Sequence, residues 1–258
     1  MVGAVDVYDP ETNGWLPRSE KPLPVANVQA VVIDGMIYAP GGTTATGAIS
    51  SALEVYDPVA DAWSSRSPLP APRAGYGLAA YDGKLYLFGG WNGTTYVDTV
   101  LVYDPAADTW ETRSPLPNNA GFSAAASLGK SILVVGGFDG TRELADCSLY
   151  TPDDDSWRTC APMSLPRGGL GLAVDGAWAY AIGGGWRQTL DFNERYDSLT
   201  NTWSSIYSPV QGQWRLPGVA GQGSLVYAVG GWSGDYLDSN EVLQSPFRVF
   251  LPFGARGN

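Results

Sequence analysis

The sequence predicts an all-β repeat protein, because three markers recur in constant phase along almost all of its 258 residues. Gly-Gly pairs begin at positions 41, 89, 136, 183 and 230, which is a spacing of 47 or 48 residues. Tryptophans keep this spacing at Trp15, Trp63, Trp110, Trp157 and Trp203. So do tyrosines, mostly within Tyr-Asp-Pro, at Tyr8, Tyr56, Tyr103, Tyr150 and Tyr196. The pattern indicates one structural unit copied about five times.

Residues 75–117 show the content of one unit, with four short segments of strand character. These segments are Gly75–Tyr81, Lys84–Phe88, Thr99–Tyr103 and Thr109–Thr112. Asp82-Gly83 is a tight-turn signal, since glycine accepts a positive φ. The first segment is rich in small residues, as suits an innermost strand where blades crowd around a channel. Four antiparallel strands per unit of about 47 residues predict a propeller blade.

The combined motif resembles the Kelch repeat family. Gly-Gly follows the second strand, Tyr-Asp-Pro stands at the second turn, and Trp lies six or seven residues beyond that Tyr. The match covers roughly residues 4–240, with mild departures at Thr151 and at Asp197-Ser198. The resemblance implies a Kelch-type β-propeller as a single domain over residues 1–246. Residues 247–258 would form a C-terminal strand or tail.

The number of blades has two interpretations. Residues 4–18 supply only a third and a fourth strand, and residues 219–244 supply a first, second and third. Either five blades close into a ring with shared ends, or a six-bladed ring has lost its first half-blade. Met1 falls in mid-repeat, so we expect a fragment whose upstream sequence is missing. An open ring would leave unpaired strand edges and could self-associate.

The composition excludes several function classes. A net charge of −11 disfavours nucleic acid and anionic membrane surfaces, which bind through Lys and Arg. No apolar run approaches the roughly 18–20 residues that a membrane-spanning helix needs. The chain has no histidine, which removes Ser-His-Asp and Cys-His catalysis and every His-ligated metal site. We therefore expect no nucleic-acid partner, no membrane insertion, no metal and no cofactor.

An enzymatic alternative comes from the resemblance to Kelch-like enzymes. The copper radical oxidases and iron-dependent specifier proteins need a histidine, which this chain lacks. A sugar-acid epimerase would instead use charged groups at the channel mouth. The candidates for such groups are Arg73, Arg167, Arg187, Asp139 and Glu143. Nothing in their spacing marks an acid–base pair.

Cys147 and Cys160 are the only two cysteines. If Tyr150 faces Trp157 across the second hairpin, Cys147 and Cys160 face each other too, because each lies three residues further from the turn. Facing Cα atoms would be about 4.5–5.5 Å apart, a distance that allows a disulfide. The alternative is a pair of reduced, buried thiols. A disulfide would indicate an oxidising compartment, such as a secreted or cell-surface location.

Large aromatic residues recur just after Gly-Gly, where the resemblance implies a partner-binding face. Its loops follow each Gly-Gly or join consecutive blades. The predicted ligand-binding residues are Trp91, Phe138, Trp186, Trp232, Arg73, Arg167, Arg187 and Asn119. Exposed Trp with Arg suits stacking on sugar rings or anchoring of a peptide. We expect a non-catalytic module for a glycan or a protein segment; alternatively, each Trp folds between blades and the array is purely structural.

Overall fold

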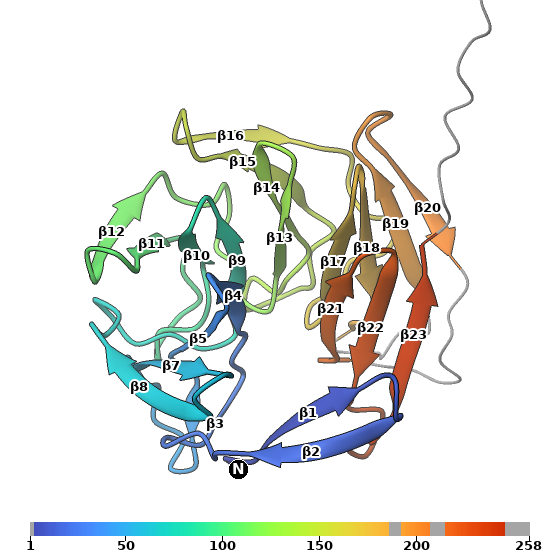
Figure 1. The fold of residues 1–258 in the computed structure, drawn as a ribbon. Coiled ribbons are helices and arrows are strands. Elements are labelled where there is room, and N and C mark those ends of the chain that lie inside the picture. Colours follow the sequence, from blue (N-terminus) through green and yellow to red (C-terminus); the bar gives the residue numbers. More distant parts are fainter. Residues whose placement is uncertain (1–2, 186–191, 207–214, 246–258) are drawn as a thin grey trace, which may run out of the picture.

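The protein is a β-propeller, seen here in a computed structural model that describes residues 3–185, 192–206 and 215–245. Every regular element in these ranges is a β-strand. The strands form antiparallel sheets arranged around one central axis (Figure 1). The predicted all-β fold with about five blades is confirmed. The predicted tail at 247–258 lies outside the described residues.

Four of the blades are complete four-stranded sheets. The first contains β4 (Val31–Ile33), β5 (Met36–Pro40), β7 (Leu53–Asp57) and β8 (Ala62–Arg66). The second contains β9 (Gly77–Tyr81), β10 (Lys84–Phe88), β11 (Val100–Asp104) and β12 (Thr109–Arg113). The third contains β13 (Ala124–Leu128), β14 (Ser131–Val135), β15 (Cys147–Thr151) and β16 (Ser156–Thr159). The fourth contains β17 (Gly171–Asp175), β18 (Trp178–Ile182), β19 (Asn193–Asp197) and β20 (Thr202–Ile206).

The two ends of the described chain form smaller sheets. A fifth sheet holds three strands, β21 (Gly218–Gln222), β22 (Leu225–Val229) and β23 (Asn240–Gln244). The N-terminal hairpin of β1 (Val5–Asp9) and β2 (Gly14–Arg18) is a sheet of its own, between this fifth sheet and the first blade (Figure 1). Two residues each from β3 (Val25–Ala26) and β6 (Thr43–Thr44) also pair. Within the described ranges, neither hairpin strand pairs with β23.

The hydrophobic core lies between neighbouring blades. Phe88 of the second blade meets Tyr150 and Trp157 of the third at ring-centroid distances of 6.0 and 5.8 Å. Branched and aromatic residues on the inner strands, such as Ile132, fill the same layer and are fully buried. Small residues on the innermost strands let those strands approach one another near the axis. The blades are therefore held together mainly by apolar side chains.

The Gly-Gly pairs lie where the backbones of neighbouring blades approach closely. Gly89 and Gly90 have φ values of 62° and 96°, which side-chain-bearing residues rarely adopt. A Cβ atom at Gly89 would also collide with the carbonyl oxygen of Ala120, in the linker that enters the next blade. The Gly90 N–H donates to that same oxygen at 2.8 Å. The repeat thus places glycine where a linker crosses directly over the preceding blade.

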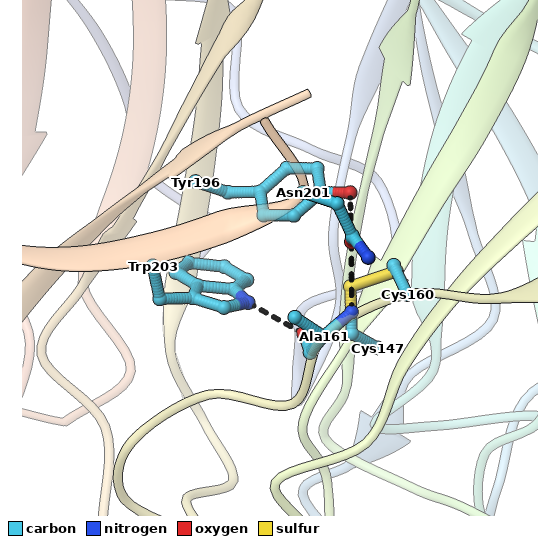
Figure 2. Close-up of a disulfide and its surroundings, with 6 residues drawn as sticks. All are labelled: Cys147, Cys160, Ala161, Tyr196, Asn201 and Trp203. Carbon is cyan, nitrogen blue, oxygen red and sulfur yellow. Dashed lines mark hydrogen bonds between the residues drawn. A yellow bond between two sulfur atoms is a disulfide. The ribbon is translucent and has the colours of Figure 1, made fainter. Parts of the chain in front are cut away.

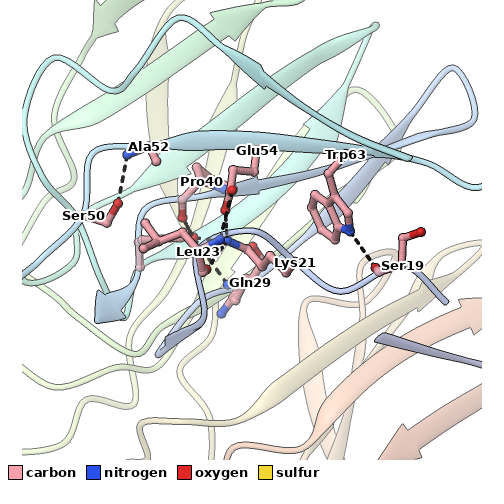
Figure 3. Close-up of polar contacts among 10 residues, drawn as sticks. Ser19, Lys21, Leu23, Gln29, Pro40, Ser50, Ala52, Glu54 and Trp63 are labelled. Carbon is pink, nitrogen blue, oxygen red and sulfur yellow. Dashed lines mark hydrogen bonds and ion pairs between the residues drawn. The ribbon is translucent and has the colours of Figure 1, made fainter. Parts of the chain in front are cut away.

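A second recurrent contact joins the blades at their outer strands. In the first blade, the Trp63 indole N–H donates to the carbonyl of Ser19 at 2.9 Å (Figure 3). The Oδ1 atom of Asp61 accepts the Ser19 N–H at 2.8 Å and the Tyr56 hydroxyl at 2.6 Å. Tyr56, Asp61 and Trp63 therefore hold both backbone groups of one residue in the preceding linker. We call such a set a Tyr–Asx–Trp triad.

The triad recurs in the next three blades, where it binds the same two backbone groups of a linker residue. Its members there are Tyr103, Asp108 and Trp110, then Tyr150, Asp155 and Trp157, then Tyr196, Asn201 and Trp203. The linker residues held are Ser67, Ser114 and Ala161, each through its N–H and its carbonyl. One residue per linker is thus fixed by two hydrogen bonds to the following blade.

Two ion pairs, one partly and one fully buried, reinforce linker positions close to these contacts. Lys21 pairs with Glu54, whose other oxygen accepts the Leu23 N–H at 3.2 Å (Figure 3). Arg167 pairs with Glu194, and both side chains are fully buried. Glu194 also accepts the Ser164 N–H at 3.0 Å. In both cases a third-strand glutamate ties the incoming linker to its blade.

A disulfide strengthens one of the contacts between blades. Cys147 of β15 is bonded to Cys160, with Cα atoms 5.1 Å apart. Cys160 directly precedes Ala161, the residue held by Asn201 and Trp203 of the following blade (Figure 2). The disulfide therefore fixes the linker to the third blade at the residue before Ala161, where the fourth blade binds the linker.

A cavity of about 750 Å³ runs along the propeller axis. Its walls are mostly small or aliphatic residues of the innermost strands, together with Gln29, Tyr227 and Trp15 of the N-terminal hairpin. None of the described segments is a helix long and apolar enough to cross a membrane.

Candidate binding face

A series of backbone hydrogen bonds borders one mouth of the channel. It joins five residues, one at each entry to a blade or sheet, and all five have φ between 53° and 67°. We call them the channel collar: Asn27, Gly75, Phe122, Gly169 and Leu216. From Gly75 onward, the N–H of each residue donates to the carbonyl of the one before it, which gives four bonds of 2.6–2.8 Å. The collar therefore couples all the blade entries at this mouth and surrounds a hollow of about 170 Å³.

The loops after Gly-Gly lie on the same face as the collar. Trp91 and Ala74 exchange two backbone hydrogen bonds, at 2.8 and 3.0 Å, and Ala74 is next to the collar residue Gly75. Phe138 pairs in the same way with Gly121, the neighbour of Phe122. Trp232 pairs with Arg215, beside Leu216. The aromatic residues after Gly-Gly thus form a second, wider ring around the collar.

Four aromatic side chains make a continuous cluster on this face. Tyr96 is at its centre, with ring centroids 5.0 Å from Trp91, 5.5 Å from Phe138 and 6.4 Å from Phe122. Trp91 and Tyr96 belong to the second blade, whereas Phe122 and Phe138 belong to the third. We call these four residues the rim aromatic cluster. Trp91, Tyr96 and Phe138 are half-buried, so each retains surface that a partner could contact.

The loops that carry the cluster have defined internal geometry. Asn92 Oδ1 accepts the backbone N–H groups of Thr94 and Thr95, both at 2.9 Å. Asp139 does the same for Thr141 and Arg142, at 2.7 and 2.8 Å. The Arg142 N–H and then the Thr141 hydroxyl lower the pKa of Asp139 to about 2. These side chains fold the loops back on themselves, which is the usual role of Asn and Asp in turns.

Trp232 lies in a separate part of the same face, on the fifth sheet. The Arg215 guanidinium is 3.9 Å from the centroid of its ring, a cation–π contact. Tyr236, which forms a bridge with Trp232, is 88% exposed. The tryptophan is therefore half-buried and pairs through its backbone with an exposed tyrosine.

The predicted arginines are placed differently from the aromatic residues. Arg167 is fully buried, and besides Glu194 it donates to the carbonyls of Gly183 and Phe192 at 3.2 and 2.5 Å. Arg73 is 4% exposed and donates to the Pro72 carbonyl at 2.9 Å. Burial lowers the pKa of both guanidinium groups. Neither arginine contributes to the accessible part of the face in this structure.

Of the remaining predicted ligand-binding residues, the structure describes only Asn119. Asn119 is exposed, in the linker that enters the third blade. Trp186 and Arg187 lie outside the described residues. Tyr96 and Tyr236 were not among the residues predicted from the sequence. They stand five and four residues after Trp91 and Trp232, and this recurrence was the signal that could have found them.

Comparison with known proteins identifies the family. The family model of the KLHDC2/KLHL20/DRC7 Kelch-repeats domain matches residues 3–184. A search of curated proteins found no match. The family model covers more than half of the 258 residues. Its match agrees with the Gly-Gly, Tyr-Asp-Pro and Trp positions and with the observed blades, and we conclude that the chain belongs to this Kelch-repeat family.

Proposed function

We propose that this Kelch propeller is a non-catalytic module that binds a protein segment through the face bordered by the collar. The observation that carries the proposal is the rim aromatic cluster of Trp91, Tyr96, Phe122 and Phe138, which spans two neighbouring blades. Half-buried aromatic residues on rigid loops suit recognition of another protein, because they offer large contact area at little cost in conformational entropy.

The accessible charges of this face favour a partner with basic groups. In the described parts of these loops, carboxylates are present at Asp98, Asp139, Glu143, Asp146, Asp235 and Asp238. The accessible basic side chains are Arg142 and Arg215. Complementary charge would accelerate association with a basic segment and disfavour acidic ones. The aromatic rings would supply most of the affinity.

Other ligand classes have less support. An epimerase-like enzyme needs a charged pair that a substrate can reach, but the Arg167–Glu194 pair is completely buried. A glycan would stack best on an open tryptophan ring. One neighbour of each tryptophan already lies against it, Tyr96 for Trp91 and Arg215 for Trp232. A protein segment needs less uninterrupted ring surface.

The decisive experiment selects binders to residues 1–258 from a random peptide library and measures their affinity for the Trp91→Ala/Trp232→Ala double variant. Loss of both anchors should weaken binding by about 100-fold or more, since interface tryptophans often contribute about 2 kcal/mol each or more. Selected peptides should also carry Lys or Arg, and their binding should weaken with added salt.

A matched control is the Val59→Ala/Leu199→Ala double variant. These residues are 97% and 71% exposed, in turns between third and fourth strands at the other end of the blades. Their replacement should leave peptide affinity unchanged. Equal affinity for wild type and the tryptophan variant would contradict the proposed face. A parallel glycan array that yields the only binders would contradict the proposed ligand class.

A further inference from the structure

The N-terminal hairpin contains a fifth Tyr–Asx–Trp triad. The Tyr8 hydroxyl donates to Asn13 Oδ1 at 2.8 Å, and the ring centroids of Tyr8 and Trp15 are 5.1 Å apart. The corresponding ring distances in the four complete blades are 4.9–5.1 Å. Asn13 has a φ of 51°, and the equivalent Asp and Asn residues have φ of 46–53°. The hairpin therefore holds this triad in the same conformation as the others.

Unlike the others, this triad holds no linker residue within ranges 3–185, 192–206 and 215–245. Among the described residues, the Trp15 indole N–H has no acceptor and Asn13 Oδ1 accepts only the Tyr8 hydroxyl. Trp15 is 47% exposed, whereas the four equivalent tryptophans are half-buried and each donates to a backbone carbonyl. The Trp15 indole N–H is thus an available donor, and Asn13 Oδ1 can accept one more N–H. In the four blades, the same two groups bind the carbonyl and the N–H of one linker residue.

The surroundings of Trp15 provide space for a ligand. Trp15 and Tyr227 both line the axial cavity of about 750 Å³, and the rings of Tyr8 and Tyr227 are 6.4 Å apart. In the described residues, the collar hydrogen bonds run from Asn27 to Leu216 without a bond that joins these two ends. The hairpin therefore borders the one position where the collar is not continuous.

We propose that the triad of Tyr8, Asn13 and Trp15 is a binding site for an extended peptide segment containing a small residue followed by proline and a large apolar residue. Asn13 would accept the N–H of the small residue, and the Trp15 indole would donate to its carbonyl. This site is distinct from the rim aromatic cluster and does not depend on the function proposed for that face.

Three of the four occupied triads define this ligand chemistry, and the other holds Ser19, which is followed by Glu20. Two of them hold the serine of Ser-Pro-Leu-Pro, at residues 67–70 and 114–117. A third holds Ala161 of Ala-Pro-Met. The apolar residues Leu69, Leu116 and Met163 are only 3–6% exposed. A proline restricts the segment before binding, which reduces the entropy lost when it docks.

The test uses residues 1–258 and an acetylated, amidated peptide with the sequence of residues 66–71, Arg-Ser-Pro-Leu-Pro-Ala. In ¹H–¹⁵N spectra, the Trp15 indole signal is assigned by its disappearance in Trp15→Phe. We expect the peptide at millimolar concentration to shift this signal downfield and to shift the amides of residues 13–15. A peptide N-methylated at serine lacks the N–H that Asn13 would accept and should produce no such shift.

Two variants test whether the peptide binds at the triad rather than at another surface of the protein. Trp15→Phe keeps an aromatic ring but removes the indole N–H donor, and Asn13→Gly removes the acceptor but permits the positive φ. Each should weaken peptide binding about fivefold, the effect of losing one hydrogen bond. Leu16→Ala alters a neighbouring residue that is 52% exposed and should leave binding unchanged.

Three results would overturn the proposal. The first is an unchanged Trp15 indole signal with the peptide at millimolar concentration. The second is equal affinity for the methylated and unmethylated peptides. The third is slow hydrogen exchange of the Trp15 indole in the free protein, because this would mean that another segment already fills the site.

Discussion

The four complete blades and the N-terminal hairpin carry the same Tyr–Asx–Trp triad, but in the part of the chain that the structure describes only the blade triads hold a linker residue. The tyrosine hydroxyl, the Asx oxygen and the indole have the same arrangement in both. The difference is the presence of a linker residue between the Asx oxygen and the indole. A triad is therefore formed by its own hairpin, and the contact between blades is added to it. Stability in this propeller should divide into blade terms and interface terms.

The largest expected difference is in stability: loss of the tryptophan should lower the free energy of unfolding much more in an occupied triad than in the hairpin triad. Trp157→Ala removes a ring packed against Phe88 and Tyr150, as well as the bond to Ser114. It should lower the free energy of unfolding by about 3 kcal/mol or more. Trp15→Ala removes a half-exposed ring and should cost less than about 1 kcal/mol. Urea denaturation measures both, and equal losses would remove the distinction between the two triads.

A smaller effect is expected at the only linker that has a disulfide. Reduction of Cys147–Cys160, which are 13 residues apart, should lower the free energy of unfolding by about 3 kcal/mol at most. The Ala161 amide should then exchange faster, because its linker is no longer fixed to the third blade. Hydrogen exchange with and without dithiothreitol measures this, with the Ser67 amide as internal control. Equal acceleration of both amides would indicate general loosening instead.

The smallest expected effect is a pH dependence of the triad contacts, because the Asx residue is a titratable Asp in some triads and an Asn in others. The Tyr103 hydroxyl first, and then the Ser67 N–H, lower the pKa of Asp108. Tyr56 and Ser19 do the same to the pKa of Asp61. A depressed pKa in the folded state means that the stabilisation is complete above the unfolded value of about 4 and is lost as the pH falls through the folded value.

Asn201 does not titrate, so its contact should persist in acid. We expect the protection of the Ser67 amide to fall relative to that of the Ala161 amide as the pH drops below about 4. Hydrogen exchange corrected for intrinsic rates measures this ratio. Asp108→Asn should remove the pH dependence at Ser67 while keeping the contact. A ratio that is independent of pH in wild type would refute the assignment of this sensitivity to Asp108.

Much of the fold could be predicted because its markers are local and periodic. Gly-Gly, Tyr-Asp-Pro and Trp each depend on the geometry within one blade, so they recur at a fixed spacing in the sequence. The register that pairs Tyr150 with Trp157 also follows from one hairpin, and it places Cys147 opposite Cys160. The role of each tryptophan was not predictable in the same way. Its indole binds a backbone carbonyl 42–44 residues earlier, and any residue type can supply a carbonyl.

The candidate face was only partly predictable. Position after Gly-Gly placed Trp91, Phe138 and Trp232 around one mouth of the channel. The same reasoning could not show that the side chains of Arg73 and Arg167 turn inward. Arg167 is buried because Glu194, 27 residues later, compensates its charge. Charge compensation across a blade leaves no periodic signal in the sequence.

The channel collar has a consequence for recognition. The second, third and fourth blades are each tied to the preceding blade at two radii, by one collar hydrogen bond near the axis and by a triad at the periphery. A blade fixed at both radii cannot pivot independently about either attachment. The loops that carry Trp91 and Phe138 would then keep their separation before and after a partner arrives. Selectivity would follow from whether a ligand matches that fixed spacing, with little energy spent on reshaping the receptor.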